Sequence, residues 1–340
     1  MESSNYITMA KKILIVTDNL PDQINGVVTT YKNIEPFAIC DGYTIDYIHP
    51  GRYRHVDCPK YNEVKLAYPK GLWKEIDTLS PDYIHIATEG PLGLFARRYF
   101  TVRGYHYNTA YHTKFPEAIK KLLGVPEFMT WPLIRWFHSN SNCVLTTTES
   151  MVNQLHSKGF KKNIKPWTRG IDRNIFNPAI IKTQCTKPLL LNVSRVSAEK
   201  NLESFYELPI EGTKIQVGDG PKLEFYKRRY PDVHFVGAKT GIELARYYQQ
   251  ADVFVFPSMW DTFGLVQIEA MACGTPVAAY PVQGPLDVID QNVTGFMDND
   301  LKVAVEKCLI IDRQLVYNGS LKWSWENAWE IFKENLVSKK

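Results

Sequence analysis

Short apolar runs separated by polar, helix-compatible stretches form the main pattern along the chain. The run Lys12–Thr17 is largely apolar, as expected of a strand buried on both faces of a parallel sheet. The same pattern predicts further strands at Tyr43–Ile48, Tyr83–Ile86, Tyr107–Tyr111 and Cys143–Thr147. Helices are predicted between them, for example at Tyr31–Ile39 and Leu92–Thr101. This alternation of strand and helix predicts an α/β fold with a doubly wound parallel sheet.

The pattern restarts near residue 188, which indicates a second domain of the same kind. Its predicted strands are Pro188–Val193, Lys214–Val217, Val233–Val236, Ala251–Phe256 and Thr275–Ala279. We therefore predict two Rossmann-like domains, over 1–176 and 188–320, joined by a polar, proline-containing linker over 177–187. Because open α/β sheets bind ligands beyond the carboxyl ends of their strands, we expect the two domains to face each other across a ligand-binding cleft.

The C-terminal segment 321–340 carries a predicted helix, Ser324–Leu336, that is rich in aromatic residues. Rings of this size need a surface to bury against. We expect this helix to cross back to the N-terminal domain and to pack between the two domains. The aromatic residues concerned are Trp323, Trp325, Trp329 and Phe332.

Composition narrows the class of protein. The chain has 340 residues, enough for two domains, with 44% hydrophobic and 22% charged residues, which is typical of a globular protein. No run approaches the roughly 18 apolar residues of a membrane span, and the first residues do not resemble a secretory signal. Six scattered cysteines without a C-x-x-C pair indicate reduced thiols and no zinc site. We expect a cytoplasmic protein whose membrane contact, if any, is peripheral.

Charge is distributed unevenly between the two halves. Residues 1–170 hold 21 Lys and Arg against 15 Asp and Glu, whereas residues 171–340 hold 19 against 21. The basic half could favour an anionic partner such as a phospholipid surface or a nucleic acid. The alternative is ordinary solvating charge on a lysine-rich protein.

A glycine-containing turn follows the first predicted strand. In the run Asn25–Val28, the absence of a side chain at Gly26 lets a backbone amide approach a ligand, and a helix N-terminus at Val27 would favour anionic oxygens. The alternative is a plain strand-to-helix turn. The chain has no G-x-G-x-x-G in this place, so the dinucleotide-binding fingerprint is absent.

The second half contains two cations in a strand-to-helix connection. Arg195 and Lys200 lie in the run Ser194–Asn201, and a turn around Gly218 follows the next strand. Two such cations can neutralise a pyrophosphate, and Arg can bind it with two parallel hydrogen bonds. A solvated charged loop is the alternative explanation.

Two carboxylates follow in the run Pro257–Cys273. Asp261 is predicted in a loop, and Glu269 about one turn inside the following helix, so both can point into one pocket. Gly264 and the next amides would form the N-terminus of that helix, which suits phosphate or sugar oxygens. The alternative for Asp261 is a simple helix cap.

Taken together and in order, these motifs resemble the family 4 retaining glycosyltransferases of the GT-B fold. The likeness is greatest to bacterial α-mannosyl- and α-glucosyltransferases that build glycolipids, and it covers nearly the whole chain. The matching segments are Ile24–Thr30, Tyr111–Pro116, Thr168–Asp172 with Phe176–Pro178, Ser194–Asn201, Gly218–Pro221 and Pro257–Gly274.

The resemblance implies a role for each matching residue. Arg195 and Lys200 would hold the diphosphate of a nucleotide-sugar donor and stabilise the leaving group. Glu269 would bind the ribose hydroxyls, and Asp261 the transferred sugar. His112 would lie near the anomeric carbon. The remaining donor-binding positions that the family implies are Gly26, Val27, Gly218, Gly237, Phe263, Gly264 and Leu265.

The same resemblance implies a retaining mechanism that needs no metal and no cofactor, with the donor as a substrate. Consistently, no D-x-D motif lies where a divalent ion would bridge the phosphates. Asp261 stands where the family more often has Glu, one methylene longer. Because that carboxylate would contact the hydroxyls of the transferred sugar, the identity of the sugar stays open. The choice between a UDP- and a GDP-linked donor is open as well.

Acceptor specificity is expected in the first domain. Lys114, Lys120 and Lys121 lie on a stretch that is predicted to form a basic, amphipathic, membrane-facing helix. The leading hypothesis is therefore a lipid acceptor at the cytoplasmic face of an anionic membrane. A soluble saccharide and a modified DNA base are alternative acceptors, although no nucleic-acid-binding motif is present. An inactive sugar-nucleotide-binding module is the non-enzymatic alternative.

Overall fold

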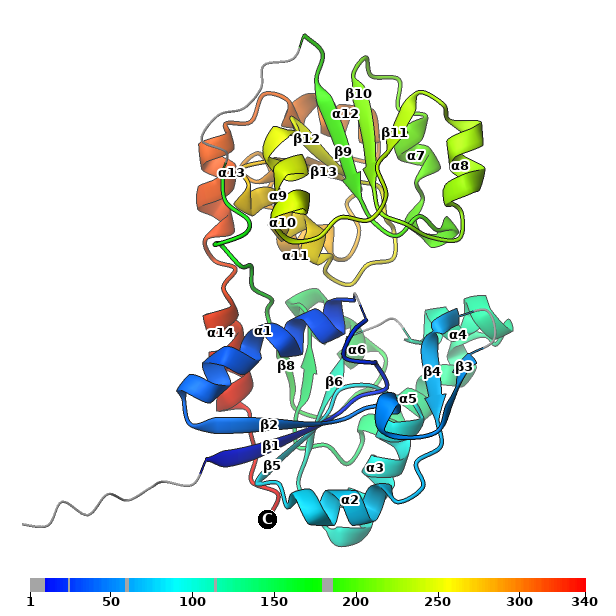
Figure 1. Ribbon diagram of the computed structural model, residues 1–340, viewed down its shortest axis with the longest axis vertical. Coiled ribbons are helices and arrows are strands. Elements are labelled where there is room, and N and C mark those ends of the chain that lie inside the picture. The colour runs from blue at the N-terminus through cyan, green and yellow to red at the C-terminus, as the bar shows by residue number, and fades with distance from the viewer. Residues whose placement is uncertain (1–9, 24, 59–60, 113–114, 179–185) are drawn as a thin grey trace, which may run out of the picture. The chain divides into compact units, whose positions relative to one another are not determined.

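The computed structural model describes residues 10–23, 25–58, 61–112, 115–178 and 186–340 (Figure 1). Contacts within the chain divide it into two compact units. The first unit comprises Met1–Thr168 together with Glu326–Lys340, and the second comprises Arg169–Trp325. Residues 169–176 thus belong to the second unit, where Ile171 and Phe176 are buried in its core.

The first unit contains a six-stranded sheet in the order β2-β1-β5-β6-β7-β8, with every neighbouring pair parallel. Its strands are β1 Lys11–Val16, β2 Tyr43–Ile48, β5 Tyr83–Ile86, β6 Asn108–Tyr111, β7 Val144–Thr146 and β8 Ile164–Pro166. A separate antiparallel hairpin consists of β3 His55–Cys58 and β4 Tyr61–Ala67. Residues Ile13–Val16 of β1 are fully buried, as the apolar run predicts.

Helices connect these strands. They are α1 Gly26–Cys40, α2 Leu72–Leu79, α3 Pro91–Arg103, α4 Phe115–Leu123, α5 Glu127–His138, α6 Glu149–Ser157 and the short 3-10 helix η1 Pro50–Arg52. Leu14 and Val16 of β1 pack with the buried residues of α2 and α3.

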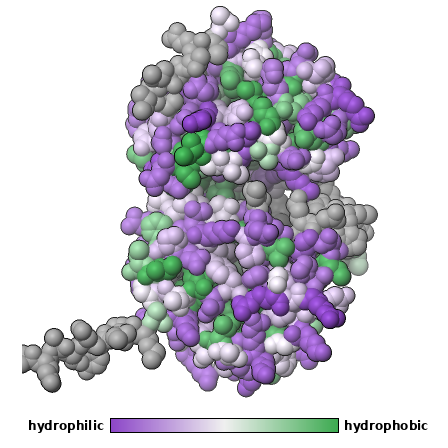
Figure 2. Space-filling view, in the orientation of Figure 1, coloured by the Kyte–Doolittle hydropathy of each residue, from purple (hydrophilic) through white to green (hydrophobic). Residues whose placement is uncertain are grey.

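On the face shown in Figure 2, hydrophobic side chains form small groups that are separated by polar surface.

The last helix, α14 (Trp325–Glu334), lies mostly in the first unit. Phe332 packs edge-on against the His85 ring with centroids 5.0 Å apart. The backbone carbonyl of Ala328 accepts a 2.7 Å hydrogen bond from the Trp167 indole, and the Trp329 indole donates to Asp41 at 2.8 Å. Trp329 and Phe332 therefore bury against strands of the first unit that are far from them in sequence, whereas Trp323 packs against Phe263 of the second unit.

The second unit contains another six-stranded parallel sheet, in the order β11-β10-β9-β12-β13-β14. Its strands are β9 Leu189–Val193, β10 Thr213–Val217, β11 Val233–Phe235, β12 Val253–Phe256, β13 Val277–Ala279 and β14 Gly295–Met297. Its helical segments are η2 Ala198–Lys200, α7 Glu203–Tyr206, α8 Leu223–Arg229, α9 Gly241–Gln250, α10 Leu265–Ala272, α11 Pro285–Val288, α12 Leu301–Cys308 and α13 Arg313–Ser320.

Alternate residues of β9 enter two separate cores. Leu191 and Val193 pack with α9 and α10, whereas Leu190 packs with α7 and α12. Because successive side chains of a strand point to opposite faces, the sheet is covered by helices on both faces. The predicted class is confirmed: the chain is α/β, with a Rossmann-like doubly wound sheet in each unit.

Three observations bear on the composition-based expectations. Cys40, Cys143, Cys273 and Cys308 are free thiols, and the last three are buried. Among the helices that the structure describes, none combines the length and the hydrophobicity needed to cross a bilayer. Within the described ranges, no group of three or more His, Cys, Asp or Glu is placed to hold a metal ion.

Candidate functional site

Loops at the carboxyl ends of β9, β10 and β11 form a connected edge in the second unit. The backbone N–H of Val196 donates to the carbonyl of Asp219 at 2.9 Å, and that of Gly218 donates to the carbonyl of Gly237 at 2.8 Å. Because parallel strands end on the same side of a sheet, these loops lie where α/β folds bind ligands. The edge therefore contains three of the segments in which the sequence predicts donor-binding residues.

Gly218 is required by the close approach of two of these loops. Its φ is +134°, and an added Cβ would lie 1.9 Å from the carbonyl oxygen of Ser194. No side chain fits at that distance. The glycine thus lets the β10 turn support the segment that carries Arg195 and Lys200.

Lys200 and Asp261 meet at this edge although they lie 61 residues apart in sequence. The Lys200 ammonium contacts both carboxylate oxygens of Asp261, at 2.8 and 2.9 Å. Each of the two side chains is 24% exposed. Asn201 adopts a left-handed conformation (φ +54°) and donates its side-chain amide to the carbonyl of Pro257 at 3.1 Å, which ties the two loops together.

Hydrogen bonds and the nearby cations of the Ser194–Asn201 loop favour the ionised form of Glu199. Burial by itself would raise the pKa of Glu199, but the pKa is lowered overall. The opposing causes are the 2.5 Å hydrogen bond from Ser197 and the charges of Arg195 and Lys200. The loop can therefore stabilise an anion next to it.

Helix α10 begins at this edge, immediately after Gly264. The φ of Gly264 is +80°, and an added Cβ would lie 2.9 Å from both the Gln267 side chain and the Phe256 ring. Its N-cap, Gly264, has no side chain with which to cap the helix, and the first turn contains no acidic residue. The positive end of its dipole thus has no carboxylate in the first turn, as suits an anionic ligand.

Glu269 lies about one turn inside α10 and is partly buried. Oε2 of its carboxylate accepts a 2.9 Å hydrogen bond from the Tyr248 hydroxyl. Burial raises the pKa of Glu269 to about 7, against the opposing effect of that hydrogen bond. Burial and the neighbouring Glu269 raise the pKa of Tyr248 well above its ordinary value, so the phenol remains a donor.

The other donor-site residues predicted in this unit, Gly237, Phe263 and Leu265, have different environments. Gly237 has φ +75° with open space where a Cβ would be. Phe263 is buried and packs edge-on against Trp323, with ring centroids 5.2 Å apart. Leu265 is partly buried against the core. Their ligand-binding roles stay predictions.

His112 belongs to the first unit, directly after β6. It is buried, and its Nε2 lies 3.2 Å from the Tyr31 hydroxyl, which is also 2.7 Å from Nε2 of His85. Burial lowers the pKa of His85 to about 3, so that imidazole is neutral. The sequence did not predict these contacts of Tyr31, because a tyrosine on a helix is typical of core packing.

Gly26 and Val27 form the first turn of α1, whose N-cap is Asn25. The Asn25 side chain accepts from the amides of Val27 and Val28, at 3.1 and 3.0 Å. The Val27 amide thus contributes to capping the helix, and its predicted contact with donor phosphates stays a prediction. An Asn immediately before a predicted helix is a sequence signal for an N-cap, so this cap could have been predicted from the sequence. Ile24, in the same motif, lies outside the described residues.

Of the three lysines predicted to face a membrane, Lys120 can be placed. It is exposed and forms a 3.0 Å ion pair with Glu127. Lys114 and the side chain of Lys121 lie outside the described residues.

Comparison with known families identifies the chain. The family model of group 1 glycosyl transferases matches residues 175–300, and that of glycosyltransferase family 4 matches residues 27–174. The chain belongs to the glycosyltransferases. The family predicted from the sequence motifs is confirmed, and with it the prediction of an enzyme of this class.

Several curated glycosyltransferases are similar over most of the chain. A sulfoquinovosyl transferase of Arabidopsis thaliana is 30% identical over 78% of this chain, which spans 56% of the plant protein's length. A GDP-mannose-dependent alpha-mannosyltransferase of Corynebacterium glutamicum is 25% identical over 84% of this chain and 76% of its own. An alpha-monoglucosyldiacylglycerol synthase of Streptococcus pneumoniae is 25% identical over 88% and 78%.

Solved structures share the fold of this glycosyltransferase. Sucrose-phosphate synthase from Thermosynechococcus elongatus matches with a TM-score of 0.76 and 20% identity, over 95% of this chain and 98% of its own. The Anabaena protein HepE, solved with UDP and glucose, matches with a TM-score of 0.70 and 14% identity, over 95% and 98%. These matches show the GT-B type of fold.

Proposed function

We propose that this glycosyltransferase moves a hexose from a UDP- or GDP-linked donor to a lipid hydroxyl, with retention of the anomeric configuration and without a metal. The observation that carries the proposal is the Lys200–Asp261 pair at the edge that also contains the start of α10. The names of two relatives, a GDP-mannose-dependent mannosyltransferase and a glucosyldiacylglycerol synthase, support a nucleotide-sugar donor and a lipid acceptor.

In the proposed site, Lys200 binds the donor diphosphate. An ammonium group has three N–H donors, and its contacts with the two Asp261 oxygens leave capacity for a phosphate oxygen. Asp261 then orients Lys200 and accepts from hydroxyls of the transferred sugar. The amides at the start of α10 supply further donors toward the phosphates. Glu269 accepts from the ribose hydroxyls.

The proposed reaction exchanges one bond to the anomeric carbon for another. The bond from that carbon to the diphosphate oxygen breaks, and the acceptor oxygen forms its bond on the same face. The acceptor proton passes to the departing diphosphate. Negative charge grows on the diphosphate in the transition state, so fixed cations and helix amides stabilise it more than the ground state.

The first unit is proposed to bind the acceptor at an anionic membrane surface. Helix α5 exposes four large apolar side chains: Phe128 by 75%, Met129 by 59%, Leu133 by 48% and Trp136 by 50%. The surrounding sequence, 91–170, holds 12 Lys and Arg against only 3 Asp and Glu. An apolar helix face within a basic region matches an anionic lipid surface in both respects.

A transfer assay tests the proposal. The protein is incubated with UDP-glucose or GDP-mannose and with diacylglycerol vesicles, a soluble oligosaccharide or hydroxylated DNA, in EDTA. We expect sugar in the lipid fraction, with the α-configuration by NMR. Transfer to the saccharide or the DNA alone would contradict the acceptor, a β-product would contradict retention, and loss of activity in EDTA would contradict metal independence. Donor binding without transfer to any acceptor would support the inactive binding module.

A further inference from the structure

We propose that Tyr248 is a positioning residue for donor binding: it fixes one carboxylate oxygen of Glu269, so that the other is presented to the ribose hydroxyls. This inference rests on the proposed function, in which Glu269 binds the ribose. It adds a residue from α9, a helix that contributes none of the sequence-predicted site residues.

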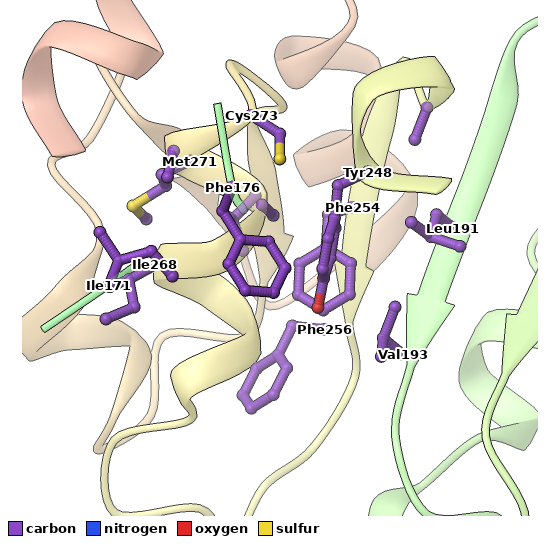
Figure 3. Close-up of a cluster of buried hydrophobic side chains, with 14 of the residues drawn as sticks. Ile171, Phe176, Leu191, Val193, Tyr248, Phe254, Phe256, Ile268, Met271 and Cys273 are labelled. Atoms are coloured by element: carbon purple, nitrogen blue, oxygen red, sulfur yellow. The ribbon is translucent and has the colours of Figure 1, made fainter. Parts of the chain in front are cut away.

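Tyr248 is itself held rigidly. Its side chain is fully buried, and its ring packs edge-on against Phe176 and Phe254, with centroids 6.1 and 5.5 Å away. Figure 3 shows these three rings together in the core cluster of the second unit. The Tyr248 carbonyl also accepts a 2.5 Å hydrogen bond from the Thr275 hydroxyl. The phenol oxygen is therefore a fixed point from which the Glu269 carboxylate is held at 2.9 Å.

The two oxygens of Glu269 have different surroundings. Oε2 accepts a hydrogen bond from the Tyr248 hydroxyl. In the described part of the chain, this hydroxyl is the one side-chain donor to the carboxylate. Glu269 is only partly buried, and Oε1 is not among the described buried atoms that lack a partner. A carboxylate accepts about four hydrogen bonds, so capacity remains for the hydroxyls of a ligand.

The other polar groups around Glu269 do not replace Tyr248. Cys273, the C-cap residue one turn beyond Glu269, has a pKa raised to about 12 by burial and by Glu269, so its thiol is neutral. Arg313 of α13 instead donates to the backbone carbonyls of Ala251, Gln249 and Cys273. Among the described side chains, Tyr248 is therefore the one that restrains the carboxylate by a hydrogen bond, and this bond lowers the pKa of Glu269.

The test is Tyr248→Phe, which keeps the ring and removes the hydroxyl. We expect Kd for UDP or GDP, whichever the wild type binds, to rise about 5- to 20-fold by calorimetry at pH 8. Because ribose binding contributes equally to ground and transition states, kcat should change by less than about twofold while KM for the donor rises. The acid limb of the donor-binding profile should move to higher pH, because the lost hydrogen bond no longer lowers the pKa of Glu269.

The matched control is Tyr226→Phe. Tyr226 is equally buried, lies in the same unit and donates to the carboxylate of Glu203 at 2.6 Å, but it belongs to the other core. We expect this variant to bind nucleotide like the wild type and to keep the acid limb in place. Equal weakening in both variants would overturn the proposal, because it would show a general effect of removing a buried hydroxyl.

A double-mutant cycle separates positioning from general destabilisation. If Tyr248 acts through Glu269, Tyr248→Phe should weaken binding no further in a Glu269→Ala background. Additive losses would overturn the inference. Failure of the wild type to bind either nucleotide would refute the proposed function, whereas wild-type binding that Tyr248→Phe leaves unchanged would refute only the role of Tyr248.

Discussion

At the scale of single residues, the two carboxylates of the site differ because their neighbours differ. Asp261 lies against the Lys200 ammonium, whereas Glu269 lies against the neutral Tyr248 hydroxyl in a partly buried position. Both residues could be proposed from the sequence, since they occupy a loop and the following helix. Lys200 could be proposed as well, but its pairing with Asp261 could not, and Tyr248 was not proposed at all. Both contacts arise only through the fold, across 61 and 21 residues of the chain.

The raised pKa of Glu269 predicts a pH-dependent cost to stability. Between the ordinary value of 4.5 and about 7, the folded protein retains a proton that the unfolded chain has lost, so stability falls as pH rises through this window. Glu269→Gln removes this ionisation and should raise Tm relative to the wild type at pH 8, with little difference at pH 4.5. Calorimetric melting at both pH values measures the effect. The same Tm difference between variant and wild type at pH 4.5 and at pH 8 would contradict this pH-dependent cost.

Lys200 supplies the charge that the proposed reaction needs. We expect Lys200→Ala to lower transfer by at least about 100-fold, because it removes a cation from the developing diphosphate charge. Circular dichroism should show a folded protein. Lys227→Ala is the control, since Lys227 belongs to the same unit and its ion pair with Glu224 lies on the exposed surface of α8. Near-wild-type transfer by Lys200→Ala would remove this residue from the site.

At the scale of elements, the buried apolar strands were predictable, and the polar or partly exposed ones were not. The run Lys12–Thr17 is apolar enough to identify β1 within one residue at each end. The β3–β4 hairpin was missed, because its residues His55–Cys58 and Tyr61–Ala67 mix charged and apolar types. Strand β14 was also missed, because it begins with glycine and its other two residues are only partly buried.

The loop edge of the second unit depends on the missing side chain of Gly218. Gly218→Ala should displace the Ser194–Asn201 loop, because its Cβ would lie 1.9 Å from the Ser194 carbonyl. We expect a cost of about 1–3 kcal/mol in unfolding free energy and weaker nucleotide binding. Gly241→Ala is a matched control: its φ is +56°, but no atom lies within 4 Å of the added Cβ. Urea denaturation and calorimetric titration compare the two. Equal losses of stability and nucleotide binding in the two variants would show that backbone strain, and not the close approach to Ser194, causes the effect.

At the scale of the whole molecule, the two units differ in charge. The excess of Lys and Arg lies in residues 1–170, and the apolar face of α5 lies within the same half. The basic composition was evident from the sequence. The exposure of Phe128 and Trp136 was not, since apolar helix residues are usually buried and only tertiary packing shows which face remains open.

This surface predicts binding to anionic vesicles. The wild type should co-sediment with phosphatidylglycerol vesicles at low salt, less at 0.5 M salt and little with phosphatidylcholine. Replacing both Phe128 and Trp136 by Ser should weaken vesicle binding by at least about tenfold. Each substitution removes apolar area that would enter the lipid interface. Ile39→Ser, at an exposed position on α1, is the control. Unchanged binding of the double variant would exclude α5 as the contact surface.

The central claim is that a nucleotide diphosphate binds at the loop edge of the second unit. A crystal structure of the protein with UDP or GDP tests it most directly. We predict phosphate oxygens within hydrogen-bonding distance of Lys200 Nζ and of the first amides of α10, with the ribose hydroxyls on Glu269. A nucleotide bound elsewhere, in contact with neither Lys200 nor the start of α10, would contradict the account.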